Sequence, residues 1–230
     1  MRFHLGAIPS SPDFVPDTPW KPVRQPSPWM GLLAAYPIGI VTAGLVAVLW
    51  LAITPFQLQD VTSTMSLRGF LVSFAGMVVV HELIHLVVHP MSGRSPHSIV
   101  GAGGPTTGVY AHYAGEMARN RFVAILLMPL VIISFVPLFV AAVGQVSSGW
   151  IAFISAFNAF GACADTLDAG LVLFHIPATA TVRCRGLRIY WREHDTLAAY
   201  FSVERMAAGD TRLQIRAPGV RRHRSPSRWP

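Results

Sequence analysis

Long apolar stretches with little or no charge are the feature that most limits what this chain can fold into. A helix needs about 20 mostly apolar residues to cross a bilayer. Four stretches meet that length: residues 30–53, 69–89, 122–143 and 149–175. Charged residues make up only 13% of the 230 residues, against about 25% in soluble domains. This composition excludes a soluble single domain and a disordered chain. We therefore expect an all-α integral membrane protein with four transmembrane helices.

The positions of the basic residues indicate how these spans are oriented. Four spans place the N-terminal segment, the second connection and the C-terminal segment on one side. Those three segments hold all but one of the 18 lysine and arginine residues, and the exception is Arg68. Because basic residues concentrate on the cytoplasmic side, we expect both termini in the cytoplasm. The protein is then a multi-pass protein of the cell membrane, and we expect a bacterial plasma membrane.

The four spans and their orientation divide the chain into three segments. Residues 1–29 form a proline-rich cytoplasmic segment, residues 30–178 the membrane domain, and residues 179–230 a basic cytoplasmic segment. Within the membrane domain, the glycine-rich connection 91–121 is expected to be a cytoplasmic or re-entrant loop, with a β-prone stretch at 108–113. The charge of the C-terminal segment fits attraction to anionic lipid. We expect the lipid bilayer as a partner and no nucleic acid, since no nucleic-acid motif is present.

The second span contains the sequence His81-Glu82-Leu-Ile-His85. Residues four apart share one face of a helix, so His81 and His85 can hold a single metal ion. Two imidazoles and one further ligand suit zinc, with a fourth position left for water. Glu82 then lies where it can take a proton from that water. The pattern predicts a zinc site with Glu82 as the catalytic base.

Chance is a poor explanation for this pattern. At this composition about 0.006 such matches are expected in a chain of this length. Polar groups at membrane depth are also costly and usually functional; the alternative is a helix end that emerges into the cytoplasm. His89 lies four residues beyond His85 and suggests a histidine stripe like that of iron desaturases. The other six histidines are scattered, so we place His89 at the membrane interface instead.

The third metal ligand is expected from the fourth span. Buried carboxylates in a membrane helix need a partner, and a metal is a good one. Asp165 and Asp168 lie in the cytoplasmic half of this span, and His81 and His85 in the cytoplasmic half of the second, so all four lie at similar depth. We expect Asp165 as the third ligand, with Asp168 as the runner-up. Asn158 is on the same helical face as Asp165 and is expected to hold the substrate backbone.

Several motifs together resemble a family of zincin-type membrane peptidases, defined as a domain of unknown function. They are HELIH, the run Glu116-Met-Ala-Arg-Asn-Arg-Phe122 leading into Leu127-Met-Pro129, and Asn158 followed by Asp165. The layout is also similar to that of the site-2 protease group of intramembrane metalloproteases. The resemblance covers roughly residues 65–180. It implies peptidase activity by analogy, since a shared fold does not by itself fix function.

The resemblance also bears on the third ligand. The family has a Ser-x-Gly-Asp-like step where this chain reads Ala162-Cys163-Ala164-Asp165, so the glycine is replaced. This step favours Asp165. Site-2 proteases carry a Leu-Asp-Gly step, which Leu167-Asp168-Ala169-Gly170 matches imperfectly, and this keeps Asp168 as the runner-up.

We therefore expect a zinc metallopeptidase of the intramembrane type that hydrolyses peptide bonds of membrane or membrane-proximal proteins. A helical substrate must unwind locally, because its amides are already hydrogen-bonded, and the connection 101–113 is a candidate to pair with the extended segment as an added strand. The alternatives are a non-catalytic zinc-binding membrane protein, acting as a scaffold or accessory subunit, and a purely structural transmembrane scaffold. The sequence does not indicate an oligomeric state.

Overall fold

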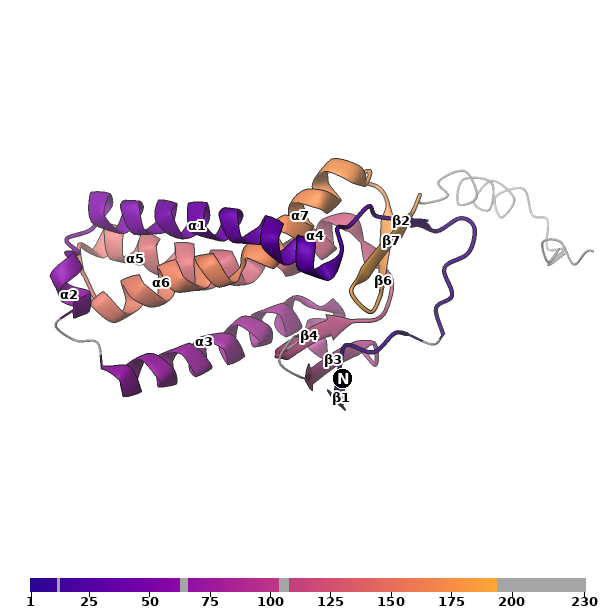
Figure 1. Ribbon diagram of the computed structural model, residues 1–230, viewed down its shortest axis with the longest axis horizontal. Helices are drawn as coiled ribbons and strands as arrows, with labels where there is room; N and C mark the ends of the chain where they lie inside the picture. Colours follow the sequence, from indigo (N-terminus) through magenta and orange to yellow (C-terminus); the bar gives the residue numbers. More distant parts are fainter. Residues whose placement is uncertain (12, 63–65, 104–107, 194–230) are drawn as a thin grey trace, which may run out of the picture. The chain divides into compact units, whose positions relative to one another are not determined.

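The computed structural model describes residues 1–11, 13–62, 66–103 and 108–193 (Figure 1). The basic tail beyond residue 193 lies outside the described residues, as does any element expected there. Along the chain, the elements are β1 (Arg2–Leu5), β2 (Lys21–Pro22), α1 (Pro28–Ile53), α2 (Leu58–Thr62), α3 (Leu67–Val88), η1 (Pro90–Gly93), β3 (Ser98–Ala102), β4 (Val109–Tyr113), β5 (Met117–Ala118), α4 (Arg119–Pro129), η2 (Leu130–Phe135), α5 (Val136–Gly144), α6 (Gly149–Gly161), α7 (Cys163–His175), β6 (Thr181–Arg185) and β7 (Arg188–Arg192).

Three helices of the described chain are long and apolar enough to cross a membrane. They are α1, α3 and the continuous helix Arg119–Gly144 that α4, η2 and α5 form together. The fourth expected span is a bent pair, because α6 and α7 meet at an angle of 49°. Large apolar side chains such as Leu33, Val72 and Val143 are exposed along these helices. Such surfaces are unfavourable in water and fit a lipid environment.

The expectation of an all-α fold is wrong, because the connections between the helices form two β-sheets. One sheet has the order β1-β3-β4, with β1 parallel to β3 and β3 antiparallel to β4. The other is antiparallel and has the order β2-β7-β6-β5. Backbone groups that leave a helix need new hydrogen-bond partners, and here they find them in segments far apart in the sequence. The β-prone stretch before Tyr113 is the second strand of the β3–β4 hairpin.

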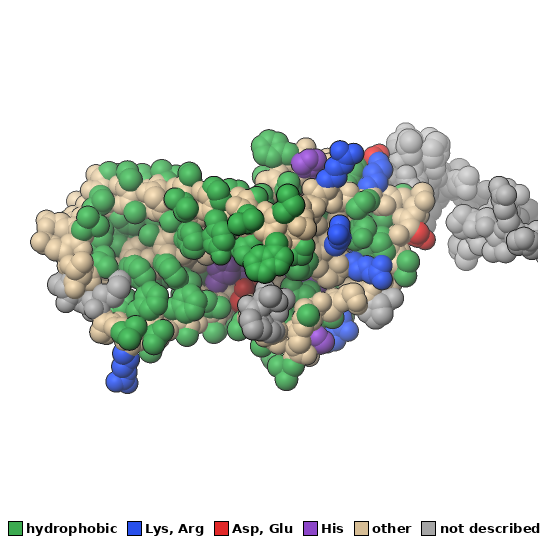
Figure 2. Space-filling model, viewed as in Figure 1, with side chains coloured by type: hydrophobic (Ala, Val, Ile, Leu, Met, Phe, Trp, Pro, Cys, Tyr) green, Lys and Arg blue, Asp and Glu red, His purple; other side chains and the backbone are tan. Residues whose placement is uncertain are grey.

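The second sheet ties together the segments that the basic residues placed on one side. Strand β2 comes from the N-terminal segment, β5 from the connection between α3 and α4, and β6 and β7 follow α7. All three segments therefore meet at one end of the helices (Figure 1). On the face shown in Figure 2, lysine and arginine side chains gather at this same end. The proline-rich segment is thus extended and paired where it forms β1 and β2.

Buried polar side chains join the helices inside their apolar part. Trp50 Nε1 of α1 donates to Ser155 Oγ of α6 over 3.0 Å. Ser155 and Ser134 each donate a hydroxyl proton to the other's carbonyl oxygen over 2.7 Å. Ser134 belongs to η2, a π-helical segment in which the Val136 N–H donates to Val131 O. Polar groups at this depth are costly unless they are paired, and these form a satisfied network.

Close contact between α1 and the bend of the α6–α7 pair depends on Gly39. A Cβ atom at this position would lie 2.8 Å from the Phe160 carbonyl oxygen and 3.0 Å from Cys163 Cβ. Both separations are shorter than an ordinary van der Waals contact. The absence of a side chain at Gly39 therefore lets α1 pack against the bend that leads into α7, which carries Asp165.

Candidate metal centre

Helix α3 presents His81 and His85 on one face, one turn apart. The side chains are 12% and 7% exposed, respectively. The helix begins with the Ser66 side chain, which accepts a hydrogen bond from the Gly69 N–H. At its other end, the guanidinium of Arg121 donates to the carbonyl oxygens of Val88 and His89, which are among the groups that a helix C-terminus leaves unpaired. These contacts fix both ends of the helix that carries the motif.

Three possible ligand atoms converge where α3 faces α7. His81 Nε2 lies 3.1 Å from Asp165 Oδ2 and 3.2 Å from His85 Nε2, and His85 Nε2 lies 3.5 Å from Asp165 Oδ2. Zinc bonds of about 2.0–2.2 Å in tetrahedral geometry place neighbouring ligand atoms about 3.3 Å apart. Among the described residues, this is the one group of three or more His, Cys, Asp or Glu side chains close enough to hold a metal ion.

Hydrogen bonds on the far side of each ring fix which nitrogens carry protons. His85 Nδ1 lies 2.8 Å from the Ile125 carbonyl oxygen. Because a carbonyl oxygen can only accept, Nδ1 is the donor. His81 Nδ1 lies 2.9 Å from Asn158 Oδ1. Asn158 donates through Nδ2 to Pro129 O and to Ser134 Oγ, so its Oδ1 is the acceptor and His81 Nδ1 is also a donor.

Both Nε2 atoms of the neutral rings therefore carry lone pairs, and these face each other and the Asp165 carboxylate. Three lone pairs cannot converge without a positive charge among them. A proton on one ring satisfies two of the three atoms, whereas a divalent metal ion satisfies all three. Donation from the outer ring nitrogen to a protein oxygen is also the usual way in which metal-binding histidines are oriented. The donor set fits zinc.

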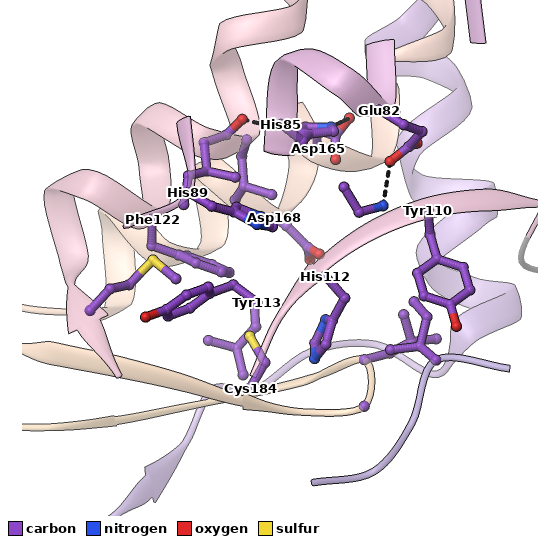
Figure 3. Close-up of a pocket in the computed structure, with 18 residues that line it drawn as sticks. Glu82, His85, His89, Tyr110, His112, Tyr113, Phe122, Asp165, Asp168 and Cys184 are labelled. Carbon is purple, nitrogen blue, oxygen red and sulfur yellow. Dashed lines mark hydrogen bonds and ion pairs between the residues drawn. The ribbon is translucent and has the colours of Figure 1, made fainter. Parts of the chain in front are cut away.

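Glu82 joins the helix to strand β4. Its Oε2 accepts a hydrogen bond from the Ala111 N–H over 2.7 Å. Within the described part of the chain β4 pairs only with β3, so the Ala111 N–H lies on the edge of the strand that faces α3. Figure 3 shows Glu82 at the same end of the cavity as His85 and Asp165. A carboxylate in this position can accept a proton from a group placed beside the three ligand atoms.

The remaining residues singled out from the sequence have clear positions. Asp168 is outside the group of three and accepts from Gln25 Nε2 over 3.3 Å. Asn158 is fully buried, and its amide contacts His81, Pro129 and Ser134 rather than open space. His89 follows the end of α3, is 1% exposed and packs against the ring of Tyr113 in β4.

A cavity of about 200 Å³ opens beside His85 and Asp165 (Figure 3). It runs from Glu82, His85 and Asp165 towards the strands and is lined by His89, His112 and Cys184 among others. Burial lowers the pKa of His112 from 6.5 to about 4. Burial, with the charge of His85 adding to it, lowers the pKa of His89 to about 4 as well. Burial raises the pKa of Cys184 to about 12, so this thiol is protonated at neutral pH.

The contacts that the sequence did not indicate are mainly backbone groups. The Ile125 carbonyl oxygen and the Ala111 N–H carry no signal in the sequence, because every residue except proline offers the same groups. The link from Gln25 to the hairpin of β6 and β7 was also missed. The Gln25 side chain donates to Leu187 O and accepts from the Ile189 N–H. A glutamine among prolines gives no indication of these partners.

These features define a class of protein: apolar helices long enough to span a membrane, with a His-His-Asp group of metal-binding geometry beside a glutamate. Residues 74–181 match the model of a family whose description reads "Putative zincin peptidase". The matched segment contains all members of the group, and it confirms the resemblance found in the sequence. That family implies zinc as the metal. No curated protein and no solved structure matches the chain.

Proposed function

We propose that this protein is a membrane-embedded zinc metallopeptidase that hydrolyses peptide bonds of membrane or membrane-proximal proteins. The observation that carries the proposal is the convergence of three lone-pair atoms, from His81, His85 and Asp165, beside the carboxylate of Glu82. The match to a zincin peptidase family supports the same reaction class. We assign the third ligand to Asp165, because Asp168 lies outside the group.

Each residue has a chemical role in this proposal. Zinc held by His81, His85 and Asp165 would supply a Lewis acid for the substrate carbonyl and for the attacking water. Glu82 accepts the proton of that water and returns it to the leaving amine. Asn158 and the Ile125 carbonyl oxygen hold the two imidazoles in the orientation that leaves Nε2 free. We therefore propose that Asn158 positions His81, because all the polar atoms of its side chain have partners within the protein.

Strand β4 is the proposed contact for the substrate backbone. The edge of β4 that faces α3 carries the Ala111 N–H, and by the two-residue period of a strand it also carries the backbone groups of Val109 and Tyr113. A substrate segment that has left its helix needs partners for its amides. Pairing with this edge would supply them and would bring a peptide bond beside Glu82.

We further propose that α1, α3, the continuous helix Arg119–Gly144 and the bent α6–α7 pair each cross the membrane. Strand β2 precedes α1 and pairs with β7, which follows α7. Both ends of the helical region are therefore on one side, which requires an even number of crossings. The basic residues favour the cytoplasm for this side, and we propose the plasma membrane of a bacterium as the location.

The experiment is cleavage of a proteome-derived peptide library by detergent-purified protein, with the zinc content measured on the same samples. We expect about one zinc per chain and mapped cleavage products. Glu82→Gln should retain zinc and lose cleavage by about 100-fold or more, which is the usual contribution of a general base. Glu116→Gln is the matched control, because Glu116 is exposed and lies in an ion pair with Arg192, and it should cleave like wild type.

Three results would overturn the proposal. Stoichiometric zinc without cleavage by the wild type would assign a non-catalytic zinc-binding scaffold or accessory subunit. Equal cleavage by Glu82→Gln would show that the observed cleavage does not use Glu82 as its base. A wild-type protein that binds no zinc even when zinc is supplied would leave a structural transmembrane scaffold.

A further inference from the structure

The cavity beside the metal group is lined by polar side chains that the proposed hydrolysis does not use. His89 is 1% exposed and its Nδ1 has no hydrogen-bond partner within the described residues. His112 Nε2 is likewise buried and unpaired among them. Both side chains line the cavity, His89 from the end of α3 and His112 from β4 (Figure 3). A buried polar group without a partner costs about 1–3 kcal/mol, so two of them around one cavity indicate a bound group that completes them.

The rest of the lining limits what that group can be. Most of the wall is apolar or aromatic, formed by Tyr113, Met117, Phe122, Ile125, Leu126 and Ile189. A cavity of about 150 Å³ accommodates a benzene ring, and this one measures about 200 Å³. An aromatic ring with one polar substituent therefore fits both its size and its lining.

The charge of the residues that line the cavity further limits which group can bind there. Burial lowers the pKa of His112 to about 4, so its imidazole is neutral at pH 7. A neutral imidazole can donate to a hydroxyl group or accept from it. The Asp168 carboxylate on the same wall disfavours an acidic side chain, and its Oδ1 already accepts from Gln25. A phenol matches these properties: it is uncharged and has one group that both donates and accepts.

We propose that this cavity is the specificity pocket for a tyrosine side chain next to the scissile bond, with His89 and His112 as the hydrogen-bonding residues. The assignment rests on the proposed peptidase function, since Glu82 and two of the three proposed ligands, His85 and Asp165, lie at one end of the same cavity (Figure 3). It adds a substrate class to that function. A site that hydrogen-bonds a hydroxyl group discriminates strongly against the analogue that lacks it, because its own polar groups are then left unpaired.

The first test is cleavage specificity. In the peptide library we expect tyrosine to be enriched at one position flanking the mapped cleavage sites. For a peptide derived from such a site, replacing tyrosine with phenylalanine should lower kcat/KM at least tenfold. In His112→Leu and in His89→Leu the ratio between the two peptides should fall towards one. The exposed His175→Leu is the control and should keep the wild-type ratio. Cleavage without tyrosine enrichment, or enrichment of lysine and arginine, which would point to Asp168, overturns the proposal.

The second test does not depend on cleavage. Binding of N-acetyl-tyrosinamide and N-acetyl-phenylalaninamide to zinc-loaded Glu82→Gln protein is followed by NMR line broadening. We expect the tyrosine compound to bind at least tenfold more tightly, and this preference should be lost when His112→Leu is added. Equal binding of the two compounds overturns the pocket assignment even if peptides are cleaved. If the protein prefers the tyrosine compound but cleaves no peptide, the pocket assignment is supported. Only the peptidase function is then rejected.

Discussion

Asn158 Oδ1 accepts a hydrogen bond from His81 Nδ1 over 2.9 Å, although the two residues are 77 positions apart in the sequence. The same amide donates to Pro129 O and to Ser134 Oγ. Asn158 is fully buried, and its side-chain oxygen and nitrogen both have partners within the protein. This contact therefore connects the polar network between the helices to the proposed metal site.

Replacing Asn158 with leucine should weaken zinc binding about 10- to 100-fold, the usual effect of losing the partner of a metal-binding histidine. Competition with a fluorescent zinc chelator measures the affinity. Asn120→Leu is the control, because Asn120 is exposed at the start of α4. Unchanged zinc affinity with a higher KM would instead return Asn158 to the substrate-binding role expected from the sequence.

Removing a metal ligand should remove the metal. We expect about one zinc per chain in wild type and almost none in His85→Ala or Asp165→Ala, because two remaining ligands hold zinc poorly. Mass spectrometry of the purified protein gives the zinc content. Asp168→Ala serves as the comparison and should keep zinc, since Asp168 lies outside the group. Zinc retained in Asp165→Ala but lost in Asp168→Ala would exchange the roles of the two aspartates.

Stability should fall as the pH is lowered from about 6.5 towards 4, partly through His112. Its pKa is about 4 in the fold and 6.5 as the ordinary value, so between these values the unfolded chain binds a proton that the fold rejects. The contribution of neutral His112 to the free energy of unfolding is fully present above pH 6.5 and amounts to at most about 3 kcal/mol. Thermal unfolding of wild type and His112→Phe in detergent measures it.

Between pH 7.5 and 4.5, the melting temperature of His112→Phe should fall less than that of wild type. His175→Phe, at an exposed position, should follow wild type. Equal losses in wild type and His112→Phe would show that His112 is not kept neutral by the fold.

Accessibility of single cysteines should report the topology. In a chain with Cys163 and Cys184 replaced by alanine, a membrane-impermeant maleimide should label Gln57→Cys and Val146→Cys on intact cells. It should label Ser92→Cys only after permeabilisation. All three positions are exposed, and the first two lie at the helix ends opposite the sheets. The reverse pattern would invert the proposed orientation.

The sequence predicted the helices and the convergence of His81, His85 and Asp165 because both depend on regular spacing. The i, i+4 rule placed the two histidines on one face, and the direction of the spans brought Asp165 to their depth. The strands could not be predicted in the same way. They are two to five residues long, and β2 pairs with β7 across most of the chain, so their partners depend on the finished helical arrangement.

The contact between Asn158 and His81 and the bend in the last span escaped prediction for other reasons. An amide on the correct face of a helix looks the same whether it meets a substrate or a histidine. The stretch from Gly149 to His175 reads as one apolar run, and nothing in its hydropathy indicates that α6 ends at Gly161. Gly39 of α1 packs closely against this bend, a contact that only the assembled helices reveal.

The π-helical segment η2 makes the length of one transmembrane helix as important as its chemistry. A π turn holds about one residue more than an α turn, and Ser134, which accepts from Asn158, lies within it. Deleting a single residue between 130 and 135 would restore a regular α-helix. Residues beyond the segment would keep nearly the same orientation, but the side chains within it would turn. The helix would stay as hydrophobic and as able to insert, but the contact between Ser134 and Asn158 would lose the widened turn in which it forms. Homologous chains that share the proposed metal site should therefore vary freely in the identity of the apolar residues between 130 and 135. The number of residues in this segment should scarcely vary.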